Sequence, residues 1–169
     1  MNEPQFFPTS IPILHSGELT MRELNLEEVD QFYELSLYRN PEYNLEQAGE
    51  LIKTIQENFQ NREALNWGMY LGEELIGTCG YYRGFANNQG EIGFVIRKKF
   101  RRQGWTLKAA KRAIQYGFED LRLDLITAYV RDDNFPSQQL IAQLGFERTE
   151  EKPEDHRRYE LPKNRFFQG

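Results

Sequence analysis

The residues best suited to chemistry lie in a basic segment near the middle of an acidic chain. The formal net charge is −5, yet positions 92–118 contain neither Asp nor Glu. A helix N-terminus offers unpaired N–H groups and a positive dipole end, and a glycine such as Gly104 permits close approach of a ligand. The segment therefore predicts a strand–turn–helix that binds a pyrophosphate, the alternative being a solvated charged turn. Its basic residues are Arg97, Lys98, Lys99, Arg101, Arg102, Lys108, Lys111 and Arg112.

The elements that must position this turn follow from hydrophobic periodicity and turn residues. Asn25 is an expected N-cap with Glu28 as its capping-box partner. The apolar residues at 92–96 predict a strand covered on both faces. The order β-α-α-β-β-β-α-β-α-β-β indicates a mixed α/β domain. Strands are predicted at 18–24, 67–71, 75–82, 92–96, 125–130, 146–149 and 157–161, with helices at about 26–39, 45–61, 106–121 and 135–144.

Length and composition indicate a globular protein, and the charge balance argues against a nucleic-acid binder. With 39% hydrophobic residues, the 169 residues predict a single domain, with an N-terminal arm (1–17), a core (18–161) and a tail (162–169). Phe6 and Phe7 of the arm are expected to cover an apolar surface. The acidic pI of about 5.2 argues against a nucleic-acid binder.

The single cysteine and the chain start add further expectations. Cys79 excludes an internal disulfide, and its apolar setting predicts a buried, inert thiol; no metal site is predicted. The start lacks the pattern of a secretory signal, and no apolar stretch approaches ~20 residues, so no membrane partner and a cytoplasmic location are expected.

Several short motifs, taken together, resemble one family. Residues 101–106, Arg-Arg-Gln-Gly-Trp-Thr, resemble the [Gln/Arg]-x-x-Gly-x-[Gly/Ala] loop of the GCN5-related N-acetyltransferases (GNAT). Asn134-Phe135-Pro136-Ser137 followed by Leu144-Gly145-Phe146 resembles the RimJ/RimL-like branch. Weaker matches in family order, from position 19 to 161, extend the resemblance over most of the chain. They lie at 19–24, 75–78, 91–94 and 155–159.

This resemblance implies the GNAT fold, a mixed central sheet of about six or seven strands with a splayed central pair and about four flanking helices. It implies acetyl-CoA as co-substrate. The preceding strand would splay from its neighbour through a bulge. Asn134 would contact the cofactor, and Ser137 would protonate the leaving thiolate. The backbone positions that would bind coenzyme A are Phe94, Val95 and Ile96 on the strand and Arg102, Gln103, Gly104, Trp105, Thr106 and Leu107 in the loop.

The sequence departs from the family pattern where the phosphates would lie. Thr106 stands where Gly or Ala is usual, and Leu107-Lys108 replaces a common Thr-Glu pair. The Thr106 hydroxyl would either donate a hydrogen bond or crowd the cofactor. Lys108 loses a favourable carboxylate–dipole interaction of roughly 0.3–1 kcal/mol but adds positive charge for a phosphate-rich ligand.

Acetyl transfer to an amine needs a neutral amine, a stabilised oxyanion and a proton for the thiolate. Glu91 is the favoured base because it lies on the catalytic strand, and Tyr129 and His156 are weaker candidates. Glu91 has a simpler interpretation as a solvated strand-end charge and His156 as a surface or sheet-edge histidine, and Ser137 and Asn134 could be only helix caps. The aromatics Trp105, Tyr81, Tyr82 and Phe85 line the acceptor pocket in one interpretation and the core in the other.

The predicted function is direct acetyl transfer from acetyl-CoA to a primary amine, either a protein N-terminal α-amine or a small molecule. The alternative is a non-catalytic acyl-CoA-binding or regulatory protein of the same fold. The sequence leaves the acceptor open, and the oligomeric state is expected to be monomer or homodimer.

Overall fold

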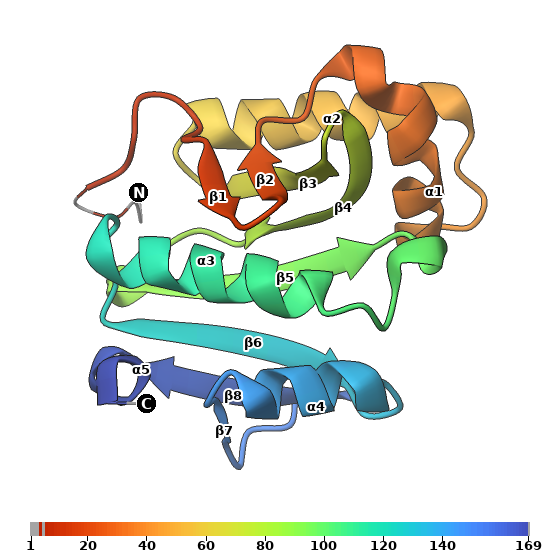
Figure 1. Cartoon of the computed structure of the whole chain (residues 1–169). Helices are drawn as coiled ribbons and strands as arrows, with labels where there is room; N and C mark the ends of the chain where they lie inside the picture. The colour runs from red at the N-terminus through yellow and green to blue at the C-terminus, as the bar shows by residue number, and fades with distance from the viewer. Residues whose placement is uncertain (1–3, 5, 169) are drawn as a thin grey trace.

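The computed structural model describes residue 4 and residues 6–168, which form one mixed sheet of eight strands (Figure 1). Across the sheet the order is β1-β2-β3-β4-β5-β6-β8-β7. Neighbours are antiparallel except β5 and β6, which are parallel. The strands are β1 (Leu14–Ser16), β2 (Leu19–Arg22), β3 (Leu65–Leu71), β4 (Glu74–Tyr81), β5 (Gln89–Ile96), β6 (Leu125–Arg131), β7 (Glu147–Arg148) and β8 (His156–Pro162).

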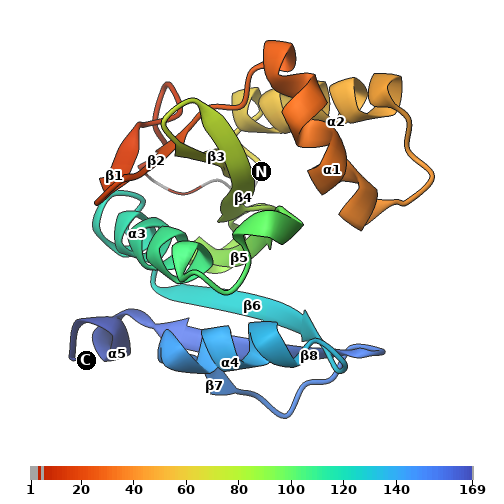
Figure 2. The same cartoon turned by 45° about the vertical axis from the view of Figure 1, so that its right-hand side comes forward.

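Helices cover the two faces of the sheet unequally (Figures 1 and 2). On one face α1 and α2 pack over β3 and β4, and on the other α3 packs over β4 and β5. Helix α4 lies beside β6 on the α3 side, whereas α1 and α2 extend only over the N-terminal half of the sheet. The helices are α1 (Val29–Arg39), α2 (Leu45–Gln60), α3 (Trp105–Glu119), α4 (Phe135–Gln143) and the short α5 (Lys163–Gln168).

Alternation along β5 sends its side chains to two different environments. Ile92 belongs to the core under α3, and Phe94 packs against it. Val95 packs instead against the smaller cluster under α1 and α2. Glu91 and Gly93 share the face of Val95, at the end of the strand that α1 and α2 leave uncovered.

Strands β5 and β6 separate soon after they begin. Their parallel ladder joins only residues 89–91 to residues 125–127. Beyond Glu91 and Thr127, β5 stays paired with β4 and β6 with β8. The predicted splayed pair is therefore present, and it opens between these two strands.

The mixed α/β class and the order of the predicted elements are confirmed, with additions at both ends. The segment 1–17, expected to be irregular, contributes β1, which pairs with β2. Phe7 is buried against Phe59 and Phe85, whereas Phe6 is 40% exposed. The expected tail contains α5, whose Phe166 packs against Phe118. With β1 the sheet exceeds the six or seven strands expected.

Two local predictions are wrong. Asn25 does not cap α1, because a 3₁₀ turn (Leu26–Glu28) intervenes; its side chain donates to the Glu28 carboxylate, which also pairs with Arg22. The expected bulge is absent from the β4–β5 ladder, which keeps one register. The register shift lies instead between β3 and β4, at Met69/Tyr70. Within the described residues, no helix is long and apolar enough to cross a membrane.

Candidate active site

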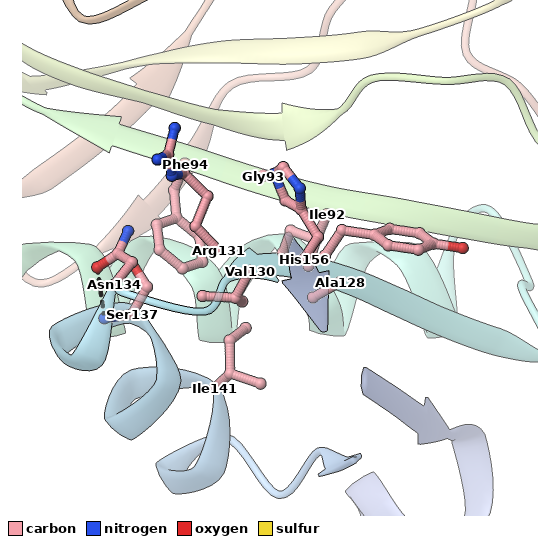
Figure 3. Close-up of a pocket in the computed structure, with 11 residues that line it drawn as sticks. Ile92, Gly93, Phe94, Ala128, Val130, Arg131, Asn134, Ser137, Ile141 and His156 are labelled. Carbon is pink, nitrogen blue, oxygen red and sulfur yellow. Dashed lines mark hydrogen bonds between the residues drawn. The ribbon is translucent and has the colours of Figure 1, made fainter. Parts of the chain in front are cut away.

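The gap between β5 and β6 holds a cavity of about 170 Å³ (Figure 3). It brings together residues that are far apart in the chain: Phe94 from β5, Asn134 and Ser137 from the start of α4, and His156 from β8. The full lining is Ile92, Gly93, Phe94, Ala128, Tyr129, Val130, Arg131, Asn134, Ser137, Ile141 and His156.

Alternate backbone groups of β5 point into this opening. The Glu91 carbonyl accepts a hydrogen bond from the N–H of Tyr82, the residue after β4 (3.2 Å). At the other end of the ladder, the Arg97 N–H donates to the Ile76 carbonyl (2.7 Å). Because bonded and non-bonded pairs alternate in an antiparallel ladder, Val95 also bonds to β4. The N–H groups of Phe94 and Ile96 face the opening instead. Two of the three strand positions predicted to bind the cofactor thus offer backbone donors, and Val95 does not.

Asn134 and Ser137 are joined by a helix cap. Asn134 is the N-cap of α4, and its Oδ1 accepts a hydrogen bond from the Ser137 N–H at 3.2 Å (Figure 3). This bond uses the serine backbone and the asparagine oxygen. It leaves the Ser137 hydroxyl and the Asn134 Nδ2 as polar groups at the cavity, so the capping role and the predicted ligand role are compatible.

The predicted phosphate loop has a backbone shaped for close approach. Gly104, the N-cap of α3, has a left-handed φ of +86°, and Arg102 has φ of +63°. A Cβ at position 104 would meet nothing within 4 Å, so space is open above the loop. The N–H groups of Trp105, Thr106 and Leu107 precede the first i→i−4 bond of α3 and have no helical partner. Gln103 braces the loop internally, accepting from the Trp105 indole at 3.1 Å.

The basic segment divides into structural and available cations. Arg97 pairs with Glu34 at 3.3 Å, and both Arg97 and Lys99 contact Glu74, at 3.6 and 3.0 Å. Their charge is therefore committed to the scaffold, which corrects the expectation that the whole run serves an anion. Among the described residues, no ion pair with a carboxylate involves the remaining cations around the loop and α3. These are Lys98, Arg101, Arg102, Lys108, Lys111 and Arg112.

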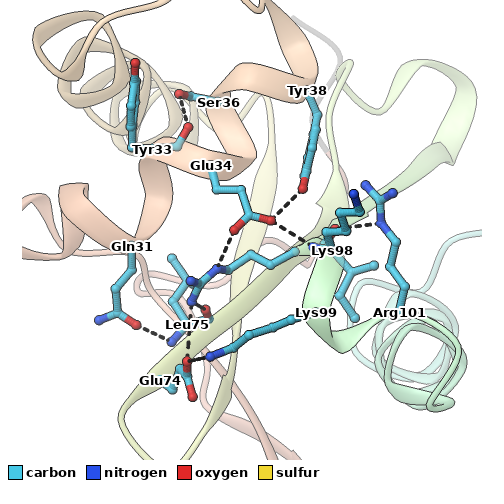
Figure 4. A network of polar contacts seen from close by, with 12 residues as sticks. Gln31, Tyr33, Glu34, Ser36, Tyr38, Glu74, Leu75, Lys98, Lys99 and Arg101 are labelled. Atoms are coloured by element: carbon cyan, nitrogen blue, oxygen red, sulfur yellow. Dashed lines mark hydrogen bonds and ion pairs between the residues drawn. The ribbon is translucent and has the colours of Figure 1, made fainter.

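Glu34 ties α1 to the segment before the loop (Figure 4). Its carboxylate accepts from the Lys98 N–H at 2.8 Å, from Arg97 and from the Tyr38 hydroxyl. Burial opposes ionisation, but these hydrogen bonds outweigh it and lower the pKa of Glu34. The contacts fix the direction in which the chain leaves β5 toward Gly104.

The three candidate bases lie on the face that α1 and α2 leave open. Glu91 has a pKa raised by burial, an effect reduced by Arg83 and His156, and it pairs with Arg83 at 3.5 Å. It does not line the cavity, whereas Tyr129 and His156 do. His156 Nδ1 contacts Asp155 at 2.8 Å. Sequence reasoning missed Asp155, although an Asp directly before a His is a visible signal.

Most of the aromatic residues proposed for an acceptor pocket belong to the core. Tyr81 and Phe85 are 0% and 1% exposed, and Trp105 packs against the core under α3. Tyr82 is half-buried, with its ring over Gly93. Cys79 is fully buried, which raises the pKa of its thiol to about 12 and confirms the prediction of an inert residue.

The residues present fit coenzyme A. A helix N-terminus with free N–H groups, an open left-handed glycine and cations that have no carboxylate partner suit its phosphates. The free N–H groups of Phe94 and Ile96 suit its amide-rich arm and the thioester carbonyl.

Comparison with known proteins agrees with this geometry. Residues 18–147 match the family described as acetyltransferase (GNAT) domain. The uncharacterised N-acetyltransferase p20 of Bacillus licheniformis is 31% identical over 146 residues, 80% of this chain and 82% of its own. The uncharacterised N-acetyltransferase YoaA of Bacillus subtilis is 28% identical over 148 residues, 81% and 84% of the two chains.

Two solved structures share the fold. A ribosomal-protein-S5-alanine acetyltransferase from Vibrio fischeri superposes with a TM-score of 0.76 at 16% identity, covering 92% of this chain and 98% of its own. The microcin C7 self-immunity acetyltransferase MccE, in complex with acetyl-CoA and AMP, gives 0.76 at 19% identity, with 87% and 93% covered. The family match and the 31% identical relative show that this chain belongs to the GNAT family of acetyltransferases and is an acyltransferase whose acetyl donor is acetyl-CoA.

Proposed function

We propose that this acetyltransferase transfers the acetyl group directly to a primary amine, across the opening between β5 and β6. The observation that carries the proposal is that Phe94, whose backbone N–H is not bonded to β4, and Ser137 line the same cavity. The cavity contains no thiol that could carry an acyl group, since Cys79 is buried in the core. We therefore propose that the amine takes the acetyl group directly from acetyl-CoA, without an acyl-enzyme intermediate.

Each part of the site has a role in this reaction. Acetyl-CoA supplies an acetyl group activated as a thioester. The Phe94 N–H stabilises the negative charge that develops on the carbonyl oxygen. The Ser137 hydroxyl protonates the departing sulfur, and Asn134 Nδ2 donates to the cofactor. The loop 102–107 and the start of α3 hold the phosphates, and Glu91, the base expected from the sequence, lies on the open face outside the cavity lining.

The acceptor class rests on the sequence motifs and on the relatives rather than on the charge of the open face. That face carries the carboxylates of Glu91 and Glu160, but each is paired with an arginine, Arg83 at 3.5 Å and Arg158 at 3.0 Å, so its charge does not select the acceptor. The RimJ/RimL-like motifs favour a protein α-amine. So does the similar structure from Vibrio fischeri, which is named a ribosomal-protein-S5-alanine acetyltransferase. We further propose that residues 18–161 form the catalytic core of one domain in this branch, working in the cytoplasm.

The test is thiol release from acetyl-CoA with the purified protein and a panel of peptides and small amines, with acetylated products identified by mass spectrometry. Turnover with an amine, and one added acetyl group on it, is expected. Binding of acetyl-CoA by calorimetry without turnover on any acceptor would favour the non-catalytic alternative that the atypical Thr106-Leu107-Lys108 sequence suggests. No binding at all would refute both.

A further inference from the structure

His156 is the side chain at the cavity that is best placed to accept a proton. It begins β8, lies opposite Arg131 of β6 in register, and lines the cavity together with Gly93 and Ser137. Figure 3 shows its imidazole rising from β8 toward β5. Its side chain is 40% exposed, so a substrate amine can approach from the open face.

Asp155 fixes the orientation and the tautomer of this imidazole. The Asp155 carboxylate lies 2.8 Å from His156 Nδ1, so the neutral ring carries its proton there and leaves Nε2 with a free lone pair. The turn itself is held in place. The His156 N–H donates to Pro153 O at 3.0 Å, and the Asp132 N–H donates to Asp155 O at 2.9 Å.

Two ion pairs anchor the same turn from the other side. Asp132, at the end of β6, contacts Arg157 Nε at 2.6 Å and Lys152 Nζ at 3.1 Å. The segment that presents Asp155 and His156 is therefore tied to the connection between β6 and α4, the same connection that presents Ser137.

Glu91, the base expected from the sequence, is less well placed for this step. Its carboxylate does not line the cavity and is paired with Arg83 at 3.5 Å. It lies close enough to His156 for the two charges to interact, and this interaction lowers the pKa of Glu91 against the effect of burial.

Resting on the proposed function, we propose that His156, oriented by Asp155, is the general base that deprotonates the acceptor. The lone pair of Nε2 forms a bond to one proton of R–NH₃⁺, and the electrons of the broken N–H bond remain on nitrogen as the lone pair of R–NH₂. The imidazolium, beside Asp155 and near Glu91, then loses its proton to solvent through its exposed edge.

The charged groups around His156 belong to three strands and the turn. Asp155 is adjacent, Glu91 faces it from β5, Arg131 lies opposite on β6, and Arg158 follows on the same face of β8. Helix α4 contributes only the uncharged Asn134 and Ser137 to this side of the cavity.

The test compares His156→Asn with His15→Asn, a control at the other histidine, which lies on β1 at the far edge of the sheet. Asp155→Asn and Glu91→Gln complete the set. Values of kcat/KM are measured from pH 6 to 10 with an alanine hexapeptide bearing a free α-amine and with 1,4-diaminobutane, and acetyl-CoA affinity is measured by calorimetry.

We expect His156→Asn to lower kcat/KM at pH 7 about 100-fold or more, the usual size of a general-base effect, with acetyl-CoA affinity unchanged. The deficit shrinks as the pH approaches the pKa of the acceptor, because less of the amine then needs deprotonation, and it is larger for diaminobutane than for the α-amine. Asp155→Asn gives a smaller loss of about tenfold, and His15→Asn gives none.

Two results overturn the assignment: activity of His156→Asn within about threefold of the unaltered protein at pH 7, or a deficit of the same size at pH 7 and pH 10. A larger loss in Glu91→Gln than in His156→Asn, with the same pH behaviour, would assign the base to Glu91. Failure of the proposed function looks different, since the unaltered protein would then release no thiol with either amine.

Discussion

Replacing Gly104 by Asp and by Asn separates the charge at the loop from its backbone geometry. The φ of +86° costs an ordinary L-residue roughly 1–2 kcal/mol, and less for Asn and Asp, which tolerate this region best. A Cβ there meets no atom within 4 Å, so neither side chain clashes. Both variants are therefore expected to unfold within a few degrees of the unaltered protein.

Their affinities for acetyl-CoA should differ strongly. A carboxylate about 4 Å from one phosphate charge is repelled by about 1 kcal/mol in water and about 4 kcal/mol near a protein surface. We expect Gly104→Asp to bind acetyl-CoA about 10- to 100-fold more weakly than Gly104→Asn at low salt, with the gap closing as salt rises.

Calorimetry at low and at near-physiological salt measures both constants, with melting curves as the check on folding. Equal affinities of the Asp and Asn variants at low salt would refute the placement of phosphates at this loop.

Three further predictions concern Ser137, the half-buried carboxylate of Glu91 and the N-terminal arm. Ser137→Ala should lower kcat at least about tenfold without weakening acetyl-CoA binding, since the cap uses the backbone N–H; an unchanged kcat would make Ser137 only a cap. Burial raises the pKa of Glu91 in the folded protein above its value in the unfolded chain, so ionisation of this carboxyl destabilises the fold as the pH rises. Glu91→Gln should therefore raise Tm at pH 8 and leave it unchanged at pH 4. A gain in Tm at pH 4 alone would contradict the raised pKa. Phe7→Ala should cost about 3 kcal/mol in denaturant unfolding because Phe7 is 8% exposed against Phe59, whereas Phe6→Ala should cost much less; equal losses would contradict this packing.

The fold was largely predictable because its long elements have strong periodicity. Helix α2 (Leu45–Gln60) lies within one residue of the expected 45–61, because an apolar stripe marks it; the structure adds a capping box at Asn44. The short strand β1 could not be predicted, because its three residues between Pro12 and Gly17 are too few to show an alternating pattern. Only their pairing with β2 defines them as a strand.

The site was predictable where local sequence determines the geometry. Gly104 needs a positive φ and Asn134 caps a helix, and both leave local signals. The pairing of Arg97 with Glu34 and Glu74 depends on contacts made only in the folded protein. No spacing rule shows that Glu34 of α1 reaches Arg97 across 63 positions of the chain.

The central claim is that acetyl-CoA lies across the opening between β5 and β6, and amide hydrogen exchange followed by NMR tests it most directly. On adding acetyl-CoA, the amides of Phe94, Ile96 and residues 105–107 should gain protection, whereas that of Val95, already bonded to β4, should change little. Protection confined to other segments, or equal gains at Phe94 and Val95, would contradict the account.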